Sequence, residues 1–191
     1  MMNLMGQALR PFSLWGFHRG EFQTYTAEDL LGHWTVLYFY PADFSFVCPT
    51  ELQDLAEHYD RFRREGCHVF SVSMDTHYTH KAWAEASELI RSLPFAMLAD
   101  PAAELAGQFG AVDPARGQTY RVTVLLRPDG RVKYYELCDM DLGRNAGELL
   151  RKVRAARHLD ETEGGLCPAN WQSPEQTLIP ELDFRFFPEE D

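Results

Sequence analysis

The chain has 191 residues, of which 45% are hydrophobic and 25% charged, a size and composition typical of one globular domain with a full-sized core. Its formal net charge of −11 argues against a nucleic-acid backbone as a partner. We expect a cytosolic protein, because the first residues lack the basic and apolar regions of a secretion signal and no apolar run approaches the ~20 residues that span a membrane.

The first clear element is the run WTVLYFY at residues 34–40, whose β-branched and aromatic residues predict a buried strand. After Pro49, apolar side chains recur at helical spacing as far as Phe62, and Gly66 is expected to end this helix. The run CHVFSVS at residues 67–73 predicts a second strand.

The following segment continues this alternation of strands and helices. Trp83, Ala86 and Ile90 have the spacing expected for the inner face of a helix. Residues 95–100 predict a short third strand. Residues 101–110 predict a short helix that opens with a proline and closes with a glycine.

Two further strands are predicted at residues 120–126 and 132–138, on either side of the turn signal RPDG. Apolar residues between positions 149 and 156 predict a last helix. Strands that alternate with helices and end in a hairpin and a helix predict an α/β fold. Its sheet is expected to be mostly parallel with one antiparallel edge.

We expect one domain over residues 1–159 and a tail over residues 160–191 that belongs to the same unit. Prolines and charges in the tail argue against regular structure. Its apolar residues nevertheless predict that it packs on a surface such as another subunit; they are Trp171, Leu178, Ile179, Phe184, Phe186 and Phe187.

The four cysteines show neither the spacing of a zinc knuckle nor that of a redox CxxC pair. In a reducing compartment we expect no structural disulfide. Cys67 and Cys138 stand at strand ends, where simple packing is expected. His77 and His80 lie three residues apart without a third ligand in view, so we expect a structural role near the site rather than a metal.

Cys48 differs from the other cysteines because Pro49 fits the first position of a helix, which places the thiol beside the N-cap. Free amides and the helix dipole favour a thiolate there, and such sites lower a cysteine pKa from about 8.5 to ~3.5–7.5. Full ionisation gains only about thirty-fold, on the order of 2 kcal/mol. A fast enzyme therefore also needs donors aimed at the charge that develops on the leaving group.

Two residues are candidates for that role. Ser45 offers a hydroxyl three residues before the thiol, but a turn or capping serine has the same pattern. Arg121 opens an apolar strand, either as an exposed charge or as a buried one with an anionic partner. Glu51 occupies the position of the second cysteine in glutaredoxin-like chemistry, so any resolving thiol must come from elsewhere in the sequence.

Three segments resemble the signatures of one family. YPADFSFVCPTEL at residues 40–52 resembles the peroxidatic motif of the peroxiredoxins, Pro-x-x-x-Thr/Ser-x-x-Cys. SVSMDTHYTHKAW at residues 71–83 and LCPANW at residues 166–171 resemble two further signatures of the typical two-cysteine branch. That branch includes the peroxidase component of bacterial alkyl hydroperoxide reductase. The resemblance runs over nearly the whole chain, and it implies a thioredoxin-like fold with helices on both faces of the sheet and no cofactor.

The resemblance also implies a role for each cysteine of the pair. Cys48 would attack a peroxide oxygen and become a sulfenic acid. Cys167 of a partner subunit would then condense with it to a disulfide, which thioredoxin or a flavoprotein disulfide reductase would reduce. Dimers would assemble into a ring, by resemblance a decamer.

Four more residues receive roles in the same way. Pro41 would shield the pocket, and Ser45 would hydrogen-bond the peroxide and the thiolate. Arg121 would stabilise the thiolate and the leaving oxygen, and Glu51 would hold the arginine.

The chain departs from the family in two respects. It has Ser45 where threonine is common, and serine lacks the methyl group that restricts the rotamer. It also lacks the glycine-rich loop and the Tyr-Phe tail of members that over-oxidise easily, which predicts ready opening and resistance to inactivation. Two other functions use the same residues or assembly: a peroxide sensor that relays oxidation to a client, and a holdase chaperone that needs no thiol.

Overall fold

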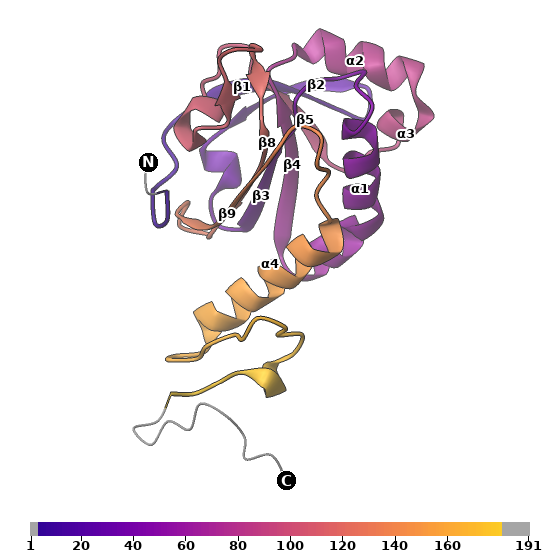
Figure 1. Cartoon of the computed structure of the whole chain (residues 1–191). Helices are drawn as coiled ribbons and strands as arrows, with labels where there is room; N and C mark the ends of the chain where they lie inside the picture. Colours follow the sequence, from indigo (N-terminus) through magenta and orange to yellow (C-terminus); the bar gives the residue numbers. More distant parts are fainter. Residues whose placement is uncertain (1–3, 181–191) are drawn as a thin grey trace.

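The computed structural model describes residues 4–180, and it contains a seven-stranded sheet, a two-stranded sheet and helices (Figure 1). No helix within these residues is long and apolar enough to cross a membrane. In chain order the elements are β1 (Ser13–His18), β2 (Glu21–Thr26), the 3-10 helix η1 (Glu28–Leu30), β3 (Trp34–Phe39), α1 (Cys48–Arg64), β4 (Cys67–Ser73), α2 (His77–Ala86), α3 (Glu88–Arg91), β5 (Ala96–Ala99), η2 (Ala106–Phe109), β6 (Val112–Asp113), β7 (Gln118–Thr119), β8 (Arg121–Leu126), β9 (Val132–Cys138), α4 (Ala146–Glu161) and η3 (Pro174–Gln176).

The large sheet has the strand order β2-β1-β5-β4-β3-β8-β9. Its centre, β3, β4 and β5, is parallel, and β8 and β9 form an antiparallel edge, so both predictions are confirmed. The hairpin β1–β2 adds a second antiparallel edge that the sequence patterns did not predict. At its turn Arg19 and Gly20 have φ values of 51° and 89°, as tight two-residue hairpins require.

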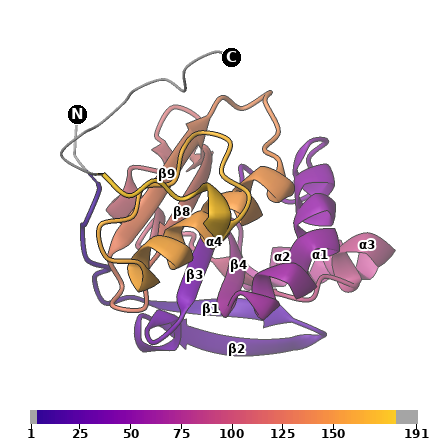
Figure 2. The same cartoon turned by 90° about the horizontal axis from the view of Figure 1, so that it is seen from below.

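Buried apolar side chains cover both faces of the large sheet. Val36 and Tyr38 of β3 belong to one group and Leu37 and Phe39 to the other, because alternate residues of a strand point to opposite faces. The first group includes side chains from all four α-helices, and the second includes side chains from η1 and η2. Helices therefore lie on both faces, the four α-helices on one and η1 and η2 on the other. The tail with η3 lies beside α4 (Figure 2).

The helix expected around Trp83 and Ile90 is divided into α2 and α3. Ser87 between them has extended backbone angles, φ −135° and ψ 119°, and its hydroxyl accepts a hydrogen bond from the Ile90 amide. Trp83 and Ile90 are buried as predicted. Ala86 is exposed, so its assignment to the inner face was wrong: the break at Ser87 interrupts the helical repeat that the prediction assumed.

The helix expected at residues 101–110 is also shorter, since only Ala106–Phe109 is helical and it is a 3-10 turn. Ala103 has a φ of 56°, which an α-helix does not accommodate. Three successive amides after it donate to the carboxylate of Asp100 at 2.6–3.0 Å, which fixes the turn. Gly110 ends the segment with a φ of 61°, as expected.

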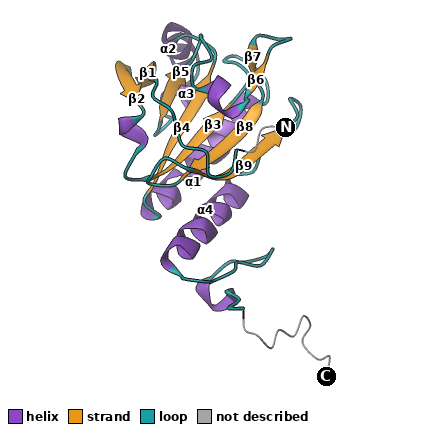
Figure 3. Ribbon diagram, turned by 90° about the vertical axis from the view of Figure 1, so that its left-hand side faces the viewer, coloured by secondary structure: helices purple, strands orange, loops and turns teal. Residues whose placement is uncertain are grey.

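The last helix, α4, begins where α1 and the sheet meet. Asn145 caps it by accepting a hydrogen bond from the Glu148 amide at 2.8 Å. Asp54 of α1 accepts a second hydrogen bond, from the Ala146 amide at 2.7 Å, and so joins the two helices. The tail then leaves the body beyond the far end of α4 (Figure 3). The division of the chain at residue 160 stays a prediction.

The described part of the tail folds back on itself and on α4. Leu166 and Leu178 pair as an antiparallel bridge. Trp171 is 2% exposed, stacks on His158 of α4 and donates its ring N–H to Thr177 at 3.2 Å. The expected packing of Trp171 is thus found within the chain. Leu178 and Ile179 remain exposed, and Phe184, Phe186 and Phe187 lie outside the described residues.

Candidate active site

Cys48 is the first residue of α1, directly after the N-cap residue Val47. Pro49 follows in the first turn, and no side chain caps this end of the helix. The predicted position of the thiol at the mouth of a helix is therefore confirmed. Its side chain is fully buried, with 0% exposure.

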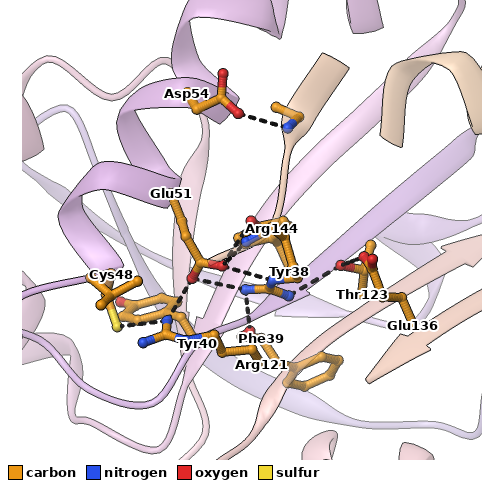
Figure 4. A network of polar contacts seen from close by, with 12 residues as sticks. Tyr38, Phe39, Tyr40, Cys48, Glu51, Asp54, Arg121, Thr123, Glu136 and Arg144 are labelled. Carbon is orange, nitrogen blue, oxygen red and sulfur yellow. Dashed lines mark hydrogen bonds and ion pairs between the residues drawn. The ribbon is translucent and has the colours of Figure 1, made fainter. Parts of the chain in front are cut away.

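Arg121 is the first residue of β8 and is also buried, with 3% exposure. Its Nη1 lies 3.4 Å from the Cys48 sulfur and 2.6 Å from Oε2 of Glu51 (Figure 4). Its Nε donates to the Met140 carbonyl at 2.8 Å. Of the two alternatives for this arginine, the structure shows the buried one with an anionic partner. One guanidinium group thus bridges the thiol and the carboxylate.

A second arginine, Arg144, completes the network around Glu51. Its amide and Nε donate to Oε1 of Glu51 at 2.8 and 2.9 Å, and its Nη2 lies 3.2 Å from Oε2. The guanidinium carbon lies 3.5 Å from the ring centroid of Tyr38, whose hydroxyl donates to Oε1 at 3.3 Å. Sequence reasoning missed Arg144, because it stands in a loop that has no periodic pattern.

The network keeps its charges although it is buried. Burial raises the pKa of Glu51, but the hydrogen bonds and charge of Arg144, together with Arg121, lower it below its usual value. Burial lowers the pKa of Arg121, but its hydrogen bond to Cys48 and the charge of Glu51 outweigh this effect, so the pKa lies above its usual value. Two guanidinium groups therefore surround one carboxylate, which leaves one excess positive charge beside the sulfur.

Pro41 and Ser45 belong to the loop at residues 41–47, which makes up most of the connection between β3 and α1. Pro41 is buried and Ser45 half-buried. The Ser45 hydroxyl donates to the Ala42 carbonyl at 2.8 Å rather than to Cys48. The structure thus brings Cys48, Arg121 and Glu51 together, whereas the predicted contact of Ser45 with the thiol is not formed in it.

Comparison with known proteins covers both the site and the fold. The AhpC/TSA family matches residues 5–135, which include Cys48, Glu51 and Arg121. The chain belongs to the AhpC/TSA family. It is 43% identical over 182 residues to alkyl hydroperoxide reductase C of Salmonella typhimurium and to that of Bacillus subtilis, covering 95% of this chain and 97% of each relative.

Solved structures of related proteins share the fold of this chain. The crystal structure of Enterococcus faecalis AhpC is 49% identical with a TM-score of 0.85, covering 87% of this chain and all of that one. Reduced Plasmodium vivax 2-Cys peroxiredoxin is 27% identical with a TM-score of 0.83, covering 90% of both chains. The resemblance to the peroxiredoxins, their enzyme class and their thioredoxin-like fold are confirmed.

Cys167 of this AhpC/TSA protein lies in the tail, away from Cys48. Its sulfur lies 3.9 Å from the carbonyl of Ala155, and burial raises the pKa of its thiol. Ala155 stands nine residues after the start of α4, about 14 Å along the helix at ~1.5 Å per residue. All four cysteines are free; within one chain Cys167 packs against α4, whereas Cys48 lies against Arg121.

The remaining candidates of this AhpC/TSA protein are two cysteines and two histidines. Cys67 is fully buried, where burial raises its thiol pKa, and Cys138 is half-buried at the end of β9. The His77 ring packs against that of Trp15 at a centroid distance of 5.5 Å, whereas His80 is buried and bonds to Asp43. Among residues 4–180 no three His, Cys, Asp or Glu side chains converge as metal ligands.

Proposed function

We propose that the protein reduces hydrogen peroxide and organic hydroperoxides, with Cys48 as the attacking thiol. The observation that carries this proposal is the 3.4 Å contact of Arg121 with the Cys48 sulfur at the start of α1. A cation with several donors beside a thiol can stabilise both the thiolate and the peroxide oxygen that departs as the leaving group. The relatives named alkyl hydroperoxide reductase C support organic hydroperoxides among the substrates.

In the first step the Cys48 thiolate attacks the terminal oxygen of the peroxide. The S–O bond forms as the O–O bond breaks, so the sulfur is oxidised to a sulfenic acid and the other oxygen leaves as an alkoxide or hydroxide, which takes a proton from water. Arg121 donates hydrogen bonds to that oxygen and keeps its own proton. Glu51 holds Arg121 in place, Ser45 turns its hydroxyl towards the peroxide, and Pro41 shields the sulfenic acid from water.

In the second step Cys167 of the partner subunit condenses with the sulfenic acid, which forms a disulfide and releases water. Cys48 has no exposed surface, so the first turn of α1 must open first. Thioredoxin or a flavoprotein disulfide reductase then returns both cysteines to thiols by exchange. We place this cycle in the cytoplasm, where a reducing environment keeps the thiols of the resting enzyme available.

The proposal includes a two-fold dimer whose subunits exchange tails, and a ring of such dimers, a decamer. The tail offers an apolar surface to a partner, since Leu166, Leu178 and Ile179 are each about half exposed. Two-fold symmetry gives two equivalent disulfides in each dimer.

Gel electrophoresis without reductant tests the cycle. We expect peroxide to convert the protein to a covalent dimer bridged by Cys48 and Cys167. The Cys167→Ser variant should consume about one peroxide per chain and stop as a sulfenic acid. Cys48→Ser should do neither, and Cys138→Ser should behave as the unmodified protein. A bridge that contains Cys67 or Cys138, or that forms within one chain, would contradict the proposal.

A further inference from the structure

Asp43 stands in the middle of the loop at residues 41–47, between Pro41 and Ser45, and none of the roles above uses it. Its side chain is completely buried. Its Oδ1 accepts a hydrogen bond from the Tyr40 hydroxyl at 2.7 Å, and its Oδ2 lies 2.7 Å from Nδ1 of His80 in α2. An aspartate in this setting needs donors, because a buried carboxylate without them is strongly disfavoured.

The backbone of the loop is held at the same point. The Asp43 amide donates to Oδ2 of Asp75 at 2.9 Å, and that oxygen also accepts from the Ser73 hydroxyl at 2.8 Å. Phe44 packs its ring 5.9 Å from that of Trp83 in α2. Side chains of α2 and of the segment before it therefore anchor the loop that leads into Cys48.

The closed loop is not a relaxed conformation. Phe44 has a φ of 56°, in the left-handed region that a bulky residue rarely adopts. His80 is 0% exposed, and its Nε2 has no hydrogen-bond partner within the described residues. Both features favour opening, so the closed state depends on the contacts of Asp43.

We propose that His80 is a positioning residue, which acts through Asp43 to hold the loop before Cys48 closed. This inference rests on the proposed function, because the two steps of that cycle need opposite states of the loop. Attack on peroxide needs the closed loop, in which Cys48 lies against Arg121. Disulfide formation needs the open loop, in which Cys48 is accessible. The His80–Asp43 pair sets the balance between the two steps.

Two substitutions of matched size separate the hydrogen bond from packing. Asparagine and leucine have the same branched shape, and the Nδ2 of asparagine occupies the place of Nδ1 in histidine. His80→Leu removes the donor to Asp43, whereas His80→Asn keeps it. Lys81→Ala, on the exposed face of α2, serves as a surface control.

Each step is measured separately with hydrogen peroxide. Sulfenic acid formation is followed in a Cys167→Ser background, and disulfide formation in the full cysteine set after a saturating pulse of peroxide. For His80→Leu we expect the second rate to rise by about tenfold, the usual effect of losing one buried hydrogen bond to a charged group. The first rate should fall by a smaller factor, because a loop that is mostly closed loses only part of its closed population when the open one grows. His80→Asn should restore most of both rates, and Lys81→Ala should change neither.

Asp75→Ala supplies a second test if His80→Leu does not fold, because it removes the anchor on the Asp43 amide and should shift both rates in the same directions. Unchanged rates, or rates that fall together, would overturn the role of His80. An unmodified protein that forms no Cys48–Cys167 disulfide would instead overturn the proposed function.

Discussion

At the scale of single residues, the site depends on which acceptors the nitrogens of the Arg121 guanidinium group contact. Nη1 bridges Cys48 and Glu51, and Nε is held by the Met140 carbonyl. Three acceptors in different directions suit a planar fork, which a lysine ammonium does not reproduce. The charge beside the sulfur and the geometry of the donors can therefore be separated by substitution.

We expect Arg121→Lys to slow the reaction of Cys48 with peroxide by about 100-fold, the effect of losing one aligned donor at a developing charge. Alkylation of Cys48 should slow much less, since lysine keeps the positive charge. Stopped-flow measurement of both reactions on the reduced protein checks this. Arg127→Lys, a half-exposed arginine paired with Asp160, is the control. Equal losses in the two reactions would show that Arg121 acts on the thiolate alone.

Glu51 contributes stability that depends on pH. Its pKa in the folded chain lies below the ordinary 4.5, because the hydrogen bonds and charge of Arg144 and Arg121 outweigh the effect of burial. A lowered folded pKa means that the stabilisation is complete above pH 4.5 and is lost as the pH falls through the folded value. Loss of the carboxylate leaves two buried guanidinium groups without their anion.

Glu51→Gln should therefore lower the free energy of unfolding at pH 7 by about 3–5 kcal/mol. The difference from the unmodified protein should narrow on acidification below pH 4.5, because protonation removes the same charge. Urea unfolding of the reduced proteins between pH 7 and pH 3 measures both effects. A difference that stays constant over this range would exclude the charge of Glu51 as its cause.

Sequence reasoning identified the site residues that carry a local signal. Cys48 stands before a helix with a proline, and Arg121 opens an apolar strand. Arg144 and Asp43 carry no such signal, because each lies in a loop and depends on a distant partner. Arg144 contacts Glu51 across 93 positions of the chain, and Asp43 contacts His80 across 37. Their importance follows from tertiary structure alone.

At the scale of elements, the same distinction explains which parts of the fold were predictable. β4 and β9 have the predicted bounds, because both lie next to clear turn residues. β1 and β2 were missed because they form an edge hairpin in which exposed and buried positions mix. The break at Ser87 was missed because it depends on the Ser87 hydroxyl, which caps the start of α3. The spacing of apolar residues does not reveal such a cap.

The described part of the tail is held against α4 by one large side chain, that of Trp171. Its ring is buried against His158, and its carbonyl accepts a hydrogen bond from Arg151 of α4 at 3.2 Å. Trp171→Ala removes a buried aromatic ring, which typically costs about 3–5 kcal/mol. We expect this variant to detach the segment that carries Cys167.

Disulfide formation in Trp171→Ala should slow while the first reaction with peroxide stays unchanged, since Trp171 packs on α4 and contacts neither Arg121 nor Glu51. Limited proteolysis should cut its tail faster, and gels without reductant measure the disulfide. Glu175→Ala on the exposed side of η3 should leave both properties intact. If the tail of Trp171→Ala resists protease as the unmodified tail does, the packing on α4 does not hold it.

At the scale of the whole molecule, two features remain incomplete in a single chain. Cys48 and Cys167 are separated by much of the length of α4. β9 lies at an edge of the large sheet, where the N-terminal segment pairs with its first residue, Val132, and no strand of the described residues pairs with the rest of it. An open edge strand invites pairing with another chain. Leu137 on β9 is 55% exposed, which adds apolar surface to that edge. A two-fold pairing of β9 would cover the edge and bring a second tail to each subunit.

Leu137→Lys tests this pairing. A two-fold axis repeats the substitution on both subunits, so it places two positive charges at one interface and removes two apolar side chains. Light scattering of the reduced, unmodified protein at micromolar concentration should give a dimer or a ring of dimers. Leu137→Lys should need at least about tenfold more protein to associate, because like charges oppose each other across the strands. Gln53→Lys adds the same charge to the exposed face of α1 and should associate as the unmodified protein does. A monomeric unmodified protein would exclude the exchange of tails, and with it the Cys48–Cys167 bridge between subunits.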